Sequence, residues 1–153
     1  MTSEQIEPIF RQHTKLPNVI EPFVHGNHER ESVEQLHARA LSIALPCFDE
    51  EVDRAKRRFL HLAGTGAATT QIEQVVAAAS DGKIDTLFVR AGAQVPGTFD
   101  GETHAVRLGD GRPGTTDLLD RAATDTFLAG GTVYRLEGDR MPVDDDLAAI
   151  LRY

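Results

Sequence analysis

The sequence has 153 residues, of which 41% are hydrophobic and 26% charged, and its formal net charge is −8. These values predict a soluble globular domain, or one domain with an appended arm, that needs no disulfide or metal to hold its core. The acidity disfavours nucleic acid as a partner unless the basic side chains gather on one face. We expect a cytoplasmic protein with no membrane partner. Cys47 is the only cysteine, and the sequence has neither a signal-like leader nor an apolar run approaching the about 20 residues of a membrane span.

Residues 1–31 are predicted to form an irregular N-terminal segment. A short helix is expected at residues 4–12, where apolar side chains share one side. Pro17 and Pro22 then favour extended backbone, because a proline disfavours the helical conformation of the residue before it. We therefore expect the first long regular element to begin after this segment.

A helical arm is predicted over residues 32–63. Ser32 and Gln35 stand at capping-box spacing, at which each side chain accepts a hydrogen bond from the other residue's backbone N–H. Pro46 interrupts the helical pattern, because its ring clashes with the preceding turn and it lacks a backbone donor. A second helical run follows at once and ends at Gly64, so we expect a long, bent arm.

Residues 64–153 are predicted to form an α/β domain. Its expected elements, in chain order, are a helix at 70–80, a strand at 84–90, short strands near 97–99 and 103–108, a loop at 110–114, a helix capped by Thr115 or Thr116, a strand at 132–136 and a last strand within 147–153. The buried face of the second helix is expected to comprise Leu119, Ala122, Ala123, Thr126 and Phe127. Its end is predicted at Gly130-Gly131, with one glycine in the left-handed conformation. A strand–helix–strand connection favours a right-handed crossover, so we expect one mixed sheet with helices packed on it.

Gly64 and Gly66 lie where a phosphate-binding loop would place its glycines, just before a helix. Such a loop needs a strand that leads into the glycines and a helix N-terminus that faces the anion. Here a helix precedes Gly64, and the Gly-Lys-Ser/Thr of a Walker loop is missing. We interpret these glycines as a helix stop and a turn, and predict no cofactor.

Histidines and acidic residues are the candidate metal ligands of this sequence. His25 and His28 flank a Gly-Asn turn close to Glu29 and Glu31, but a structural zinc site needs four ligands and no cysteine pair is present. His104 is interpreted as an exposed histidine in a strand. Asp144–Asp146 form an acidic turn without the spacing of a calcium loop. The sequence therefore predicts no metal site.

Two further features were considered as reactive or binding groups. Cys47 has no base or oxyanion-stabilising group near it in sequence, so we predict a buried structural thiol and no catalytic residue. The dense basic cluster "RAKRR" offers Arg54, Lys56, Arg57 and Arg58 as contacts for RNA or an acidic partner. The alternative interpretation of this cluster is a solvated helix face.

Three segments stand in a characteristic order: "TTQIEQVVAAASDGKIDTLFVR", "DLLDRAATDTFLAGGTVYRL" and the closing "AAILRY". Together they resemble the C-terminal domain of archaeal and eukaryotic peptide-chain release factors and their relative Pelota. The sequence is most similar to the bacterial relatives of that family. The resemblance covers roughly residues 8–153, and the long helix before Gly64 resembles the helix that enters that domain.

This resemblance implies a three-layer α/β/α sandwich with a mixed sheet, of the kind shared with kink-turn RNA-binding ribosomal proteins. In release factors this domain is a docking module, and hydrolysis belongs to a middle domain with a Gly-Gly-Gln loop. Here Gly130-Gly131 is followed by Thr132, so the resemblance implies no catalytic residue. Kink-turn binders carry Gly-x-Asn-Glu at a place that Gln71–Gln74 hold here. The chain resembles the C-terminal part of a longer relative.

Our leading hypothesis is a noncatalytic protein-interaction domain related to translation or ribosome rescue, with a protein partner that is associated with the ribosome. A second hypothesis is an RNA-binding domain that uses the basic cluster at residues 54–58. A third is a small hydrolase that uses histidine and aspartate residues. The exposed apolar face of the arm further predicts a homodimer.

Overall fold

The computed structural model describes residues 3–16, 19–20, 23–26, 28, 30–109 and 114–152, without the side chains of residues 3–5. The expectations for Pro17, Pro22 and Glu29, and most of the loop at 110–114, lie outside these residues. The chain divides into two compact units, Met1–Asp53 and Arg54–Tyr153. Each is described by itself.

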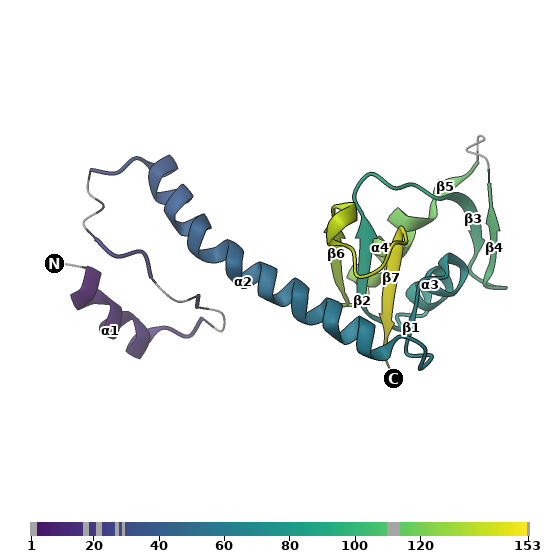
Figure 1. The fold of residues 1–153 in the computed structure, drawn as a ribbon, viewed down its shortest axis with the longest axis horizontal. Coiled ribbons are helices and arrows are strands. Elements are labelled where there is room, and N and C mark those ends of the chain that lie inside the picture. The colour runs from purple at the N-terminus through teal and green to yellow at the C-terminus, as the bar shows by residue number, and fades with distance from the viewer. Residues whose placement is uncertain are drawn as a thin grey trace. The chain divides into compact units, whose positions relative to one another are not determined.

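The first unit contains helix α1 (Ser3–His13) and most of helix α2 (Val33–Leu62) (Figure 1). Helix α1 agrees with the short helix that the sequence predicts. Phe10 on α1 meets Phe23 edge-to-face, with 6.0 Å between ring centroids. The guanidinium of Arg11 lies 5.0 Å from the centroid of the same Phe23 ring. This segment is therefore organised around one aromatic side chain.

Helix α2 begins with the predicted capping box. The backbone N–H of Ser32 donates to Gln35 Oε1 at 3.0 Å, and the backbone N–H of Gln35 donates to Ser32 Oγ at 3.3 Å. The helix continues through Pro46, whereas the sequence predicts an interruption there. One missing donor does not end a helix that keeps its hydrogen bonds on both sides. The two predicted runs therefore form a single element.

The second unit is built on a four-stranded sheet. Its strands are β1 (Ala68–Thr69), β2 (Ile84–Arg90), β6 (Thr132–Leu136) and β7 (Leu147–Leu151), in the order β1-β7-β2-β6. Strands β2 and β6 are parallel, and β7 runs antiparallel to both β1 and β2. Strands β2 and β6 have the bounds that the sequence predicts. The two-residue β1 was not predicted, because only its pairing with β7 defines it.

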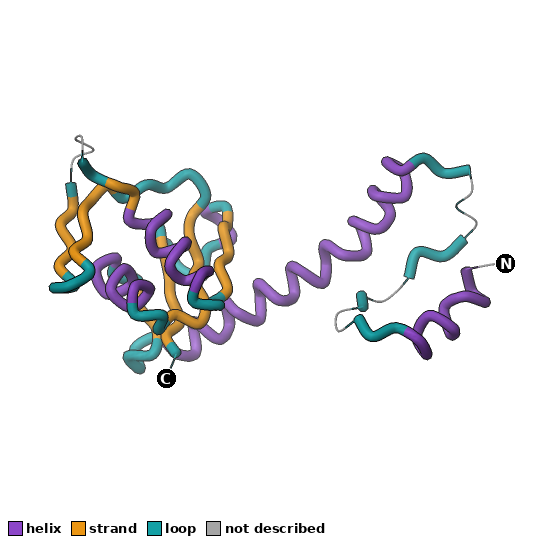
Figure 2. The backbone as a smooth tube through the Cα atoms, turned by 180° about the vertical axis from the view of Figure 1, so that it is seen from behind, coloured by secondary structure: helices purple, strands orange, loops and turns teal. Residues whose placement is uncertain are grey.

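Helices α3 (Ile72–Ser80) and α4 (Leu118–Leu128) lie over one face of this sheet (Figure 2). Because side chains alternate across a strand, Leu87 on β2 and Ala149 on β7 face these helices and join their buried core. Phe88 points to the opposite face, where it meets Phe59 of α2 edge-to-face at 6.3 Å between centroids. Helix, sheet and helix make the three layers of an α/β/α sandwich with a mixed sheet.

A second sheet contradicts the expectation of a single one. Strands β3 (Pro96–Asp100), β4 (Ala105–Leu108) and β5 (Thr116–Asp117) pair antiparallel in the order β4-β3-β5. At Gly97 on β3, an added Cβ would lie 2.5 Å from Leu118 Cδ1 and 2.8 Å from the carbonyl oxygen of Arg107. This close approach, which only a glycine permits, lets the small sheet pack against the start of α4.

Helix α4 also corrects two details of the sequence analysis. Its N-cap is Asp117, whose side chain accepts from the backbone N–H of Leu119, and neither Thr115 nor Thr116 has this role. Phe127, predicted on the buried face, is 72% exposed, whereas its neighbour Thr126 is fully buried. The predicted end is confirmed, because Gly130 has a positive φ of 75°.

The remaining elements connect these layers. A single 3-10 turn, η1 (Gly138–Arg140), follows β6 and leads into the acidic turn before β7. Within the described part of the chain, no helix has the length and apolarity that crossing a membrane requires.

Candidate functional site

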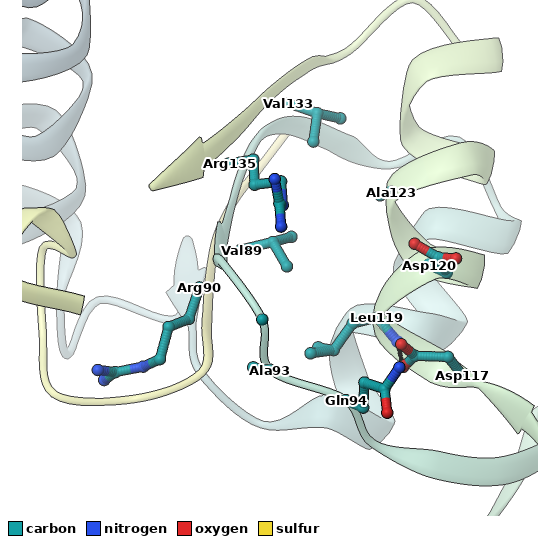
Figure 3. A pocket seen from close by; sticks show the side chains of 11 residues that line it. Val89, Arg90, Ala93, Gln94, Asp117, Leu119, Asp120, Ala123, Val133 and Arg135 are labelled. Carbon is teal, nitrogen blue, oxygen red and sulfur yellow. Dashed lines mark hydrogen bonds between the residues drawn. The ribbon is translucent and has the colours of Figure 1, made fainter. Parts of the chain in front are cut away.

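A hollow of about 280 Å³ opens where the parallel strands β2 and β6 end, beside the first turns of α4 (Figure 3). It is lined by Val89, Arg90, Gly92, Ala93, Gln94, Asp117, Leu119, Asp120, Ala123, Val133 and Arg135. Ligands of open α/β sheets bind beyond the carboxyl ends of the strands, where neighbouring loops diverge. The hollow is therefore the best-placed concave site of the second unit.

The lining of this hollow carries charges of both signs beside apolar side chains. Arg135 comes from β6 and Asp120 from α4, so they line the hollow from different elements (Figure 3). Among the described residues, neither charge is held by a hydrogen bond or an ion pair. Asp117 is engaged, because its Oδ1 accepts from the backbone N–H groups of Leu119 and Val95, each at 3.0 Å. Arg135 and Asp120 are thus the charges available to a partner.

Arg90 lines the hollow, but its charge is used elsewhere. Its guanidinium lies 3.0 Å from Asp144 Oδ1 and 3.0 Å from Asp146 Oδ1, and donates to the carbonyl oxygen of Asp145 at 3.1 Å. The acidic turn that the sequence analysis noted is therefore an anchor that fixes Arg90. Sequence reasoning missed this role, because the partners are more than 50 positions apart.

The basic cluster of α2 divides over the helix surface. At about 100° per residue, Arg54, Arg57 and Arg58 share one face, and Lys56 points to another. Arg58 forms an ion pair with Asp85 of β2. Arg54 and Arg57 are exposed. The structure therefore brings three of the four predicted contact residues together, and it engages one of the three in an ion pair.

The glycines at the end of α2 form a turn. Gly64 and Gly66 both have positive φ, 80° and 85°, and follow a helix. At the start of α3, Gln74 Nε2 donates to Gln71 Oε1 at 2.7 Å, and Thr69 Oγ1 donates to Gln74 Oε1 at 2.7 Å. The glutamines that stand in the kink-turn position therefore bind each other and β1.

Of the two N-terminal histidines considered as ligands, His28 contacts a protein partner through its ring and His25 through its backbone. His28 Nδ1 lies 3.3 Å from Glu31 Oε2, and the backbone carbonyl of His25 accepts from Arg39 Nη2 at 2.8 Å. The described residues contain no group of three or more His, Cys, Asp or Glu side chains placed to hold a metal. Cys47 is a half-buried free thiol, 3.8 Å from the carbonyl oxygen of Ile43.

His104 lies in the turn before β4, with a φ of 53°, and not in a strand as the sequence predicts. It is exposed, and its Nε2 lies 2.9 Å from Asp81 Oδ1. Lys83 Nζ donates to the other oxygen of Asp81 at 2.7 Å. Hydrogen bonds from Lys83 and then from His104 hold the pKa of the Asp81 carboxyl below its ordinary value. This trio ties the small sheet to the end of α3.

The site residues that sequence reasoning missed are those of the hollow. They come from β2, the loop after it, α4 and β6, so that no short motif unites them. The signal that was available was topological: a strand, a helix and a parallel strand place two carboxyl ends beside one helix N-terminus. The sequence indicates each of these elements, but the parallel pairing of β2 with β6 that brings their ends together is set by the tertiary structure.

The family of the chain follows from its first half. A family model described as bacterial archaeo-eukaryotic release factor family 3 matches residues 1–83, more than half of the chain. The chain belongs to this family. A search of curated protein sequences finds no match.

Solved structures give the same picture at the level of the fold. The C-terminal domain of a peptide chain release factor from Methanosarcina mazei matches with a TM-score of 0.56 and 18% identity, over 83% of this chain and 98% of that one. Archaeoglobus fulgidus Pelota matches with a TM-score of 0.50 and 18% identity, over 86% of this chain and 39% of that one.

A third structural match is a chain from a model of ribosome-bound archaeal Pelota and ABCE1. It has a TM-score of 0.59 and 15% identity, over 98% of this chain and 40% of that one. This family member thus has the fold of the release-factor C-terminal domain and corresponds to well under half of each Pelota chain.

Proposed function

We propose that the chain is a noncatalytic docking domain of a bacterial release-factor-like protein that acts in translation or ribosome rescue. One observation carries the proposal: a family member has a fold that covers 98% of a release-factor C-terminal domain. The archaeal Pelota it resembles is described as ribosome-bound, together with ABCE1. From this similarity we infer that the partner of the present chain is a ribosome-associated protein of the cytoplasm.

The side chains of the second unit support binding through a surface. Its hollow combines apolar side chains with two charges, Arg135 and Asp120, that have no partner among the described residues, and such groups orient a bound partner. Asp117 and Arg90, which also line it, are occupied by structural contacts. We therefore propose that the chain recognises a partner and does not catalyse hydrolysis.

A second candidate is RNA binding through α2. The observation that favours it is the exposed pair Arg54 and Arg57 on one helix face, which His61 extends by one turn. The net charge of −8 opposes it. Because phosphate contacts release counterions, RNA binding through this pair would weaken steeply with salt.

Co-sedimentation of the purified chain with bacterial ribosomes separates these candidates. The docking hypothesis expects the amount of chain retained on ribosomes to change little between about 50 and 200 mM salt. It also expects a cross-linked complex of the chain with its protein partner to remain after ribonuclease treatment. It also expects equal retention of the double variant Arg54→Glu/Arg57→Glu and of Arg107→Glu, a control of matched type on β4.

Three outcomes would contradict the proposal. Retention that falls steeply with salt and is lost in the double variant alone would assign the chain to RNA. Turnover of peptidyl-tRNA or of a simple ester by the isolated chain would refute the noncatalytic part. Absence of any retention would remove the ribosome-associated role.

A further inference from the structure

Strand β6 is an edge of the main sheet, because among the described residues it pairs with β2 alone. The carbonyl oxygen of Leu136 accepts from the backbone N–H of Ala91, at the end of β2. Backbone groups alternate in direction along a strand, so Tyr134 and Thr132 also face β2. The N–H and C=O groups of Val133 and Arg135 therefore point away from the sheet, where no described strand meets them.

The helix beside this edge presents a stripe of one acidic and two apolar residues. Asp120, Ala123 and Phe127 lie at i, i+3 and i+7 on α4, so they share one stripe of the helix. Ala123 lines the hollow together with Val133 of β6. Phe127 continues the stripe toward the start of β6 and is 72% exposed. An aromatic ring so exposed beside a free strand edge has the character of an interface anchor.

We propose that this β6 edge surface, formed by the outward backbone of Val133 and Arg135 with Ala123 and Phe127 beside it, docks an extended segment of a protein partner as an added strand. In this mode main-chain hydrogen bonds supply affinity, and a hollow that receives alternate side chains supplies specificity. The inference rests on the proposed docking function and names the surface that performs it.

The side chains of β6 define the chemistry of the occupant. Arg135 is exposed and has no ion-pair partner among the described residues, so an acidic residue opposite it is favoured. Val133 lies next to Ala123, so a β-branched or aromatic residue is favoured opposite it. In the antiparallel arrangement, which is the more stable per residue, the acidic residue precedes the apolar one by two positions.

A second copy of the chain fits this surface less well. Two β6 strands paired antiparallel about Tyr134 would place Arg135 of each opposite Val133 of the other, and β6 contains no acidic residue. The occupant is therefore an acidic and apolar extended peptide of another protein.

Amide hydrogen exchange of the full chain, followed by NMR, tests the inference. The probe is the acetylated and amidated peptide Thr-Thr-Asp-Thr-Val-Thr-Thr at millimolar concentration. Without peptide, the amides of Val133 and Arg135 exchange fast and those of Tyr134 and Leu136 exchange slowly. With peptide, exchange at Val133 and Arg135 slows at least several-fold. A matched peptide with Lys in place of Asp binds about fivefold more weakly.

Two variants probe the surface itself. Val133→Pro removes an outward N–H and leaves the β2 ladder intact, so it folds and loses peptide binding. Arg135→Glu is expected to bind the Lys peptide more tightly than the Asp peptide, which reverses the preference of the wild type. This variant provides the test if the proline variant fails to fold. Arg107→Glu, on a strand of the other sheet, keeps wild-type binding.

The inference is overturned by unchanged exchange at Val133 and Arg135 with both peptides. It is also overturned by undiminished protection of the Arg135 amide in the Val133→Pro variant, or by an unchanged preference for the Asp peptide in the Arg135→Glu variant. If the wild-type chain is retained on ribosomes but does not bind the peptide, the proposal for the edge surface is wrong and the docking function still stands. If the chain binds the peptide but is not retained on ribosomes, the proposed function is wrong and the proposal for the edge surface still stands.

Discussion

Arg152 connects the ends of two helices near the C-terminus of the chain. Its Nη1 donates to the carbonyl oxygens of Gly82 at 3.3 Å and Ala129 at 3.1 Å. Both carbonyls lie just beyond a helix end, where backbone acceptors lack partners and the helix dipole favours a cation. Arg152 therefore fastens α3 and α4 to the strand β7 that it follows.

Replacing Arg152 with Met keeps most of the apolar stem and removes the donors. We expect the free energy of unfolding to fall by about 1.5 to 3 kcal/mol, because the two carbonyls lose a charged, half-buried partner. Urea unfolding measures this change. Arg121→Met, which removes an exposed i,i+4 pair with Asp125 and a guanidinium 5.4 Å from the Phe99 ring centroid, should cost about 1 kcal/mol or less. Equal losses in both variants would refute the special role of Arg152.

The carboxyl group of Asp81 makes the free energy of unfolding depend on pH. Its pKa is lower in the folded chain, where Lys83 and His104 bind the carboxylate, than in the unfolded chain. The unfolded state therefore binds more protons as the pH falls below about 4, and the contribution of Asp81, present above that pH, is lost. In urea unfolding between pH 3 and 6, Asp81→Asn should show a shallower loss of stability on acidification than the wild type. A parallel loss in both proteins would contradict this assignment.

At the scale of the element, the start of α4 shows how a cap is chosen. The sequence predicts Thr115 or Thr116 as the cap, and the structure selects their neighbour Asp117, whose side chain also accepts from Val95 N–H before β3. A cap that serves a helix and a distant loop together is favoured over one that serves the helix alone. Local preference narrows the choice, and a contact 22 positions away decides it.

Asp117→Ala is expected to destabilise the chain by about 1 to 2 kcal/mol, since a capping carboxylate and a partner of Val95 N–H are lost together. Thr116→Ala removes only a long contact of 3.5 Å to the carbonyl of Gly97 and should cost much less. Thermal and urea unfolding of the two variants check the ranking. A larger effect at Thr116 would return the cap to the residue that the sequence favoured.

At the scale of the molecule, the last turns of α2 belong to the α/β unit. Phe59 is 2% exposed and packs on Phe88 of the sheet, while Phe48, on the same apolar stripe of α2, is 53% exposed. The unit begins at Arg54, ten residues before Gly64, where we expected the domain to start. We propose that the domain includes residues 54–63 as the third layer of its sandwich.

Truncating these two phenylalanines tests that layer. Phe59→Ala should cost about 3 to 5 kcal/mol, because a buried aromatic leaves a cavity between helix and sheet. Phe48→Ala should change the free energy of unfolding by about 0.5 kcal/mol or less, as for most surface substitutions. Denaturant unfolding of the full chain supplies both values. A small loss at Phe59 would mean that α2 is dispensable for the sheet.

The sequence by itself determined the local elements: the capping box of α2, the span of α3 to within two residues, and the bounds of β2 and β6. It also carried the family resemblance. These features depend on neighbours within about one turn or one strand, where backbone preference and periodicity act.

Only the tertiary structure decided the second sheet, the exposure of Phe127, the ion pairs that fix Arg90 to the acidic turn, and the free edge of β6. Each depends on which distant segments lie side by side. Because burial and pairing between remote segments outweigh local preference, a helix residue of apolar type reaches the surface and an acidic turn becomes an anchor.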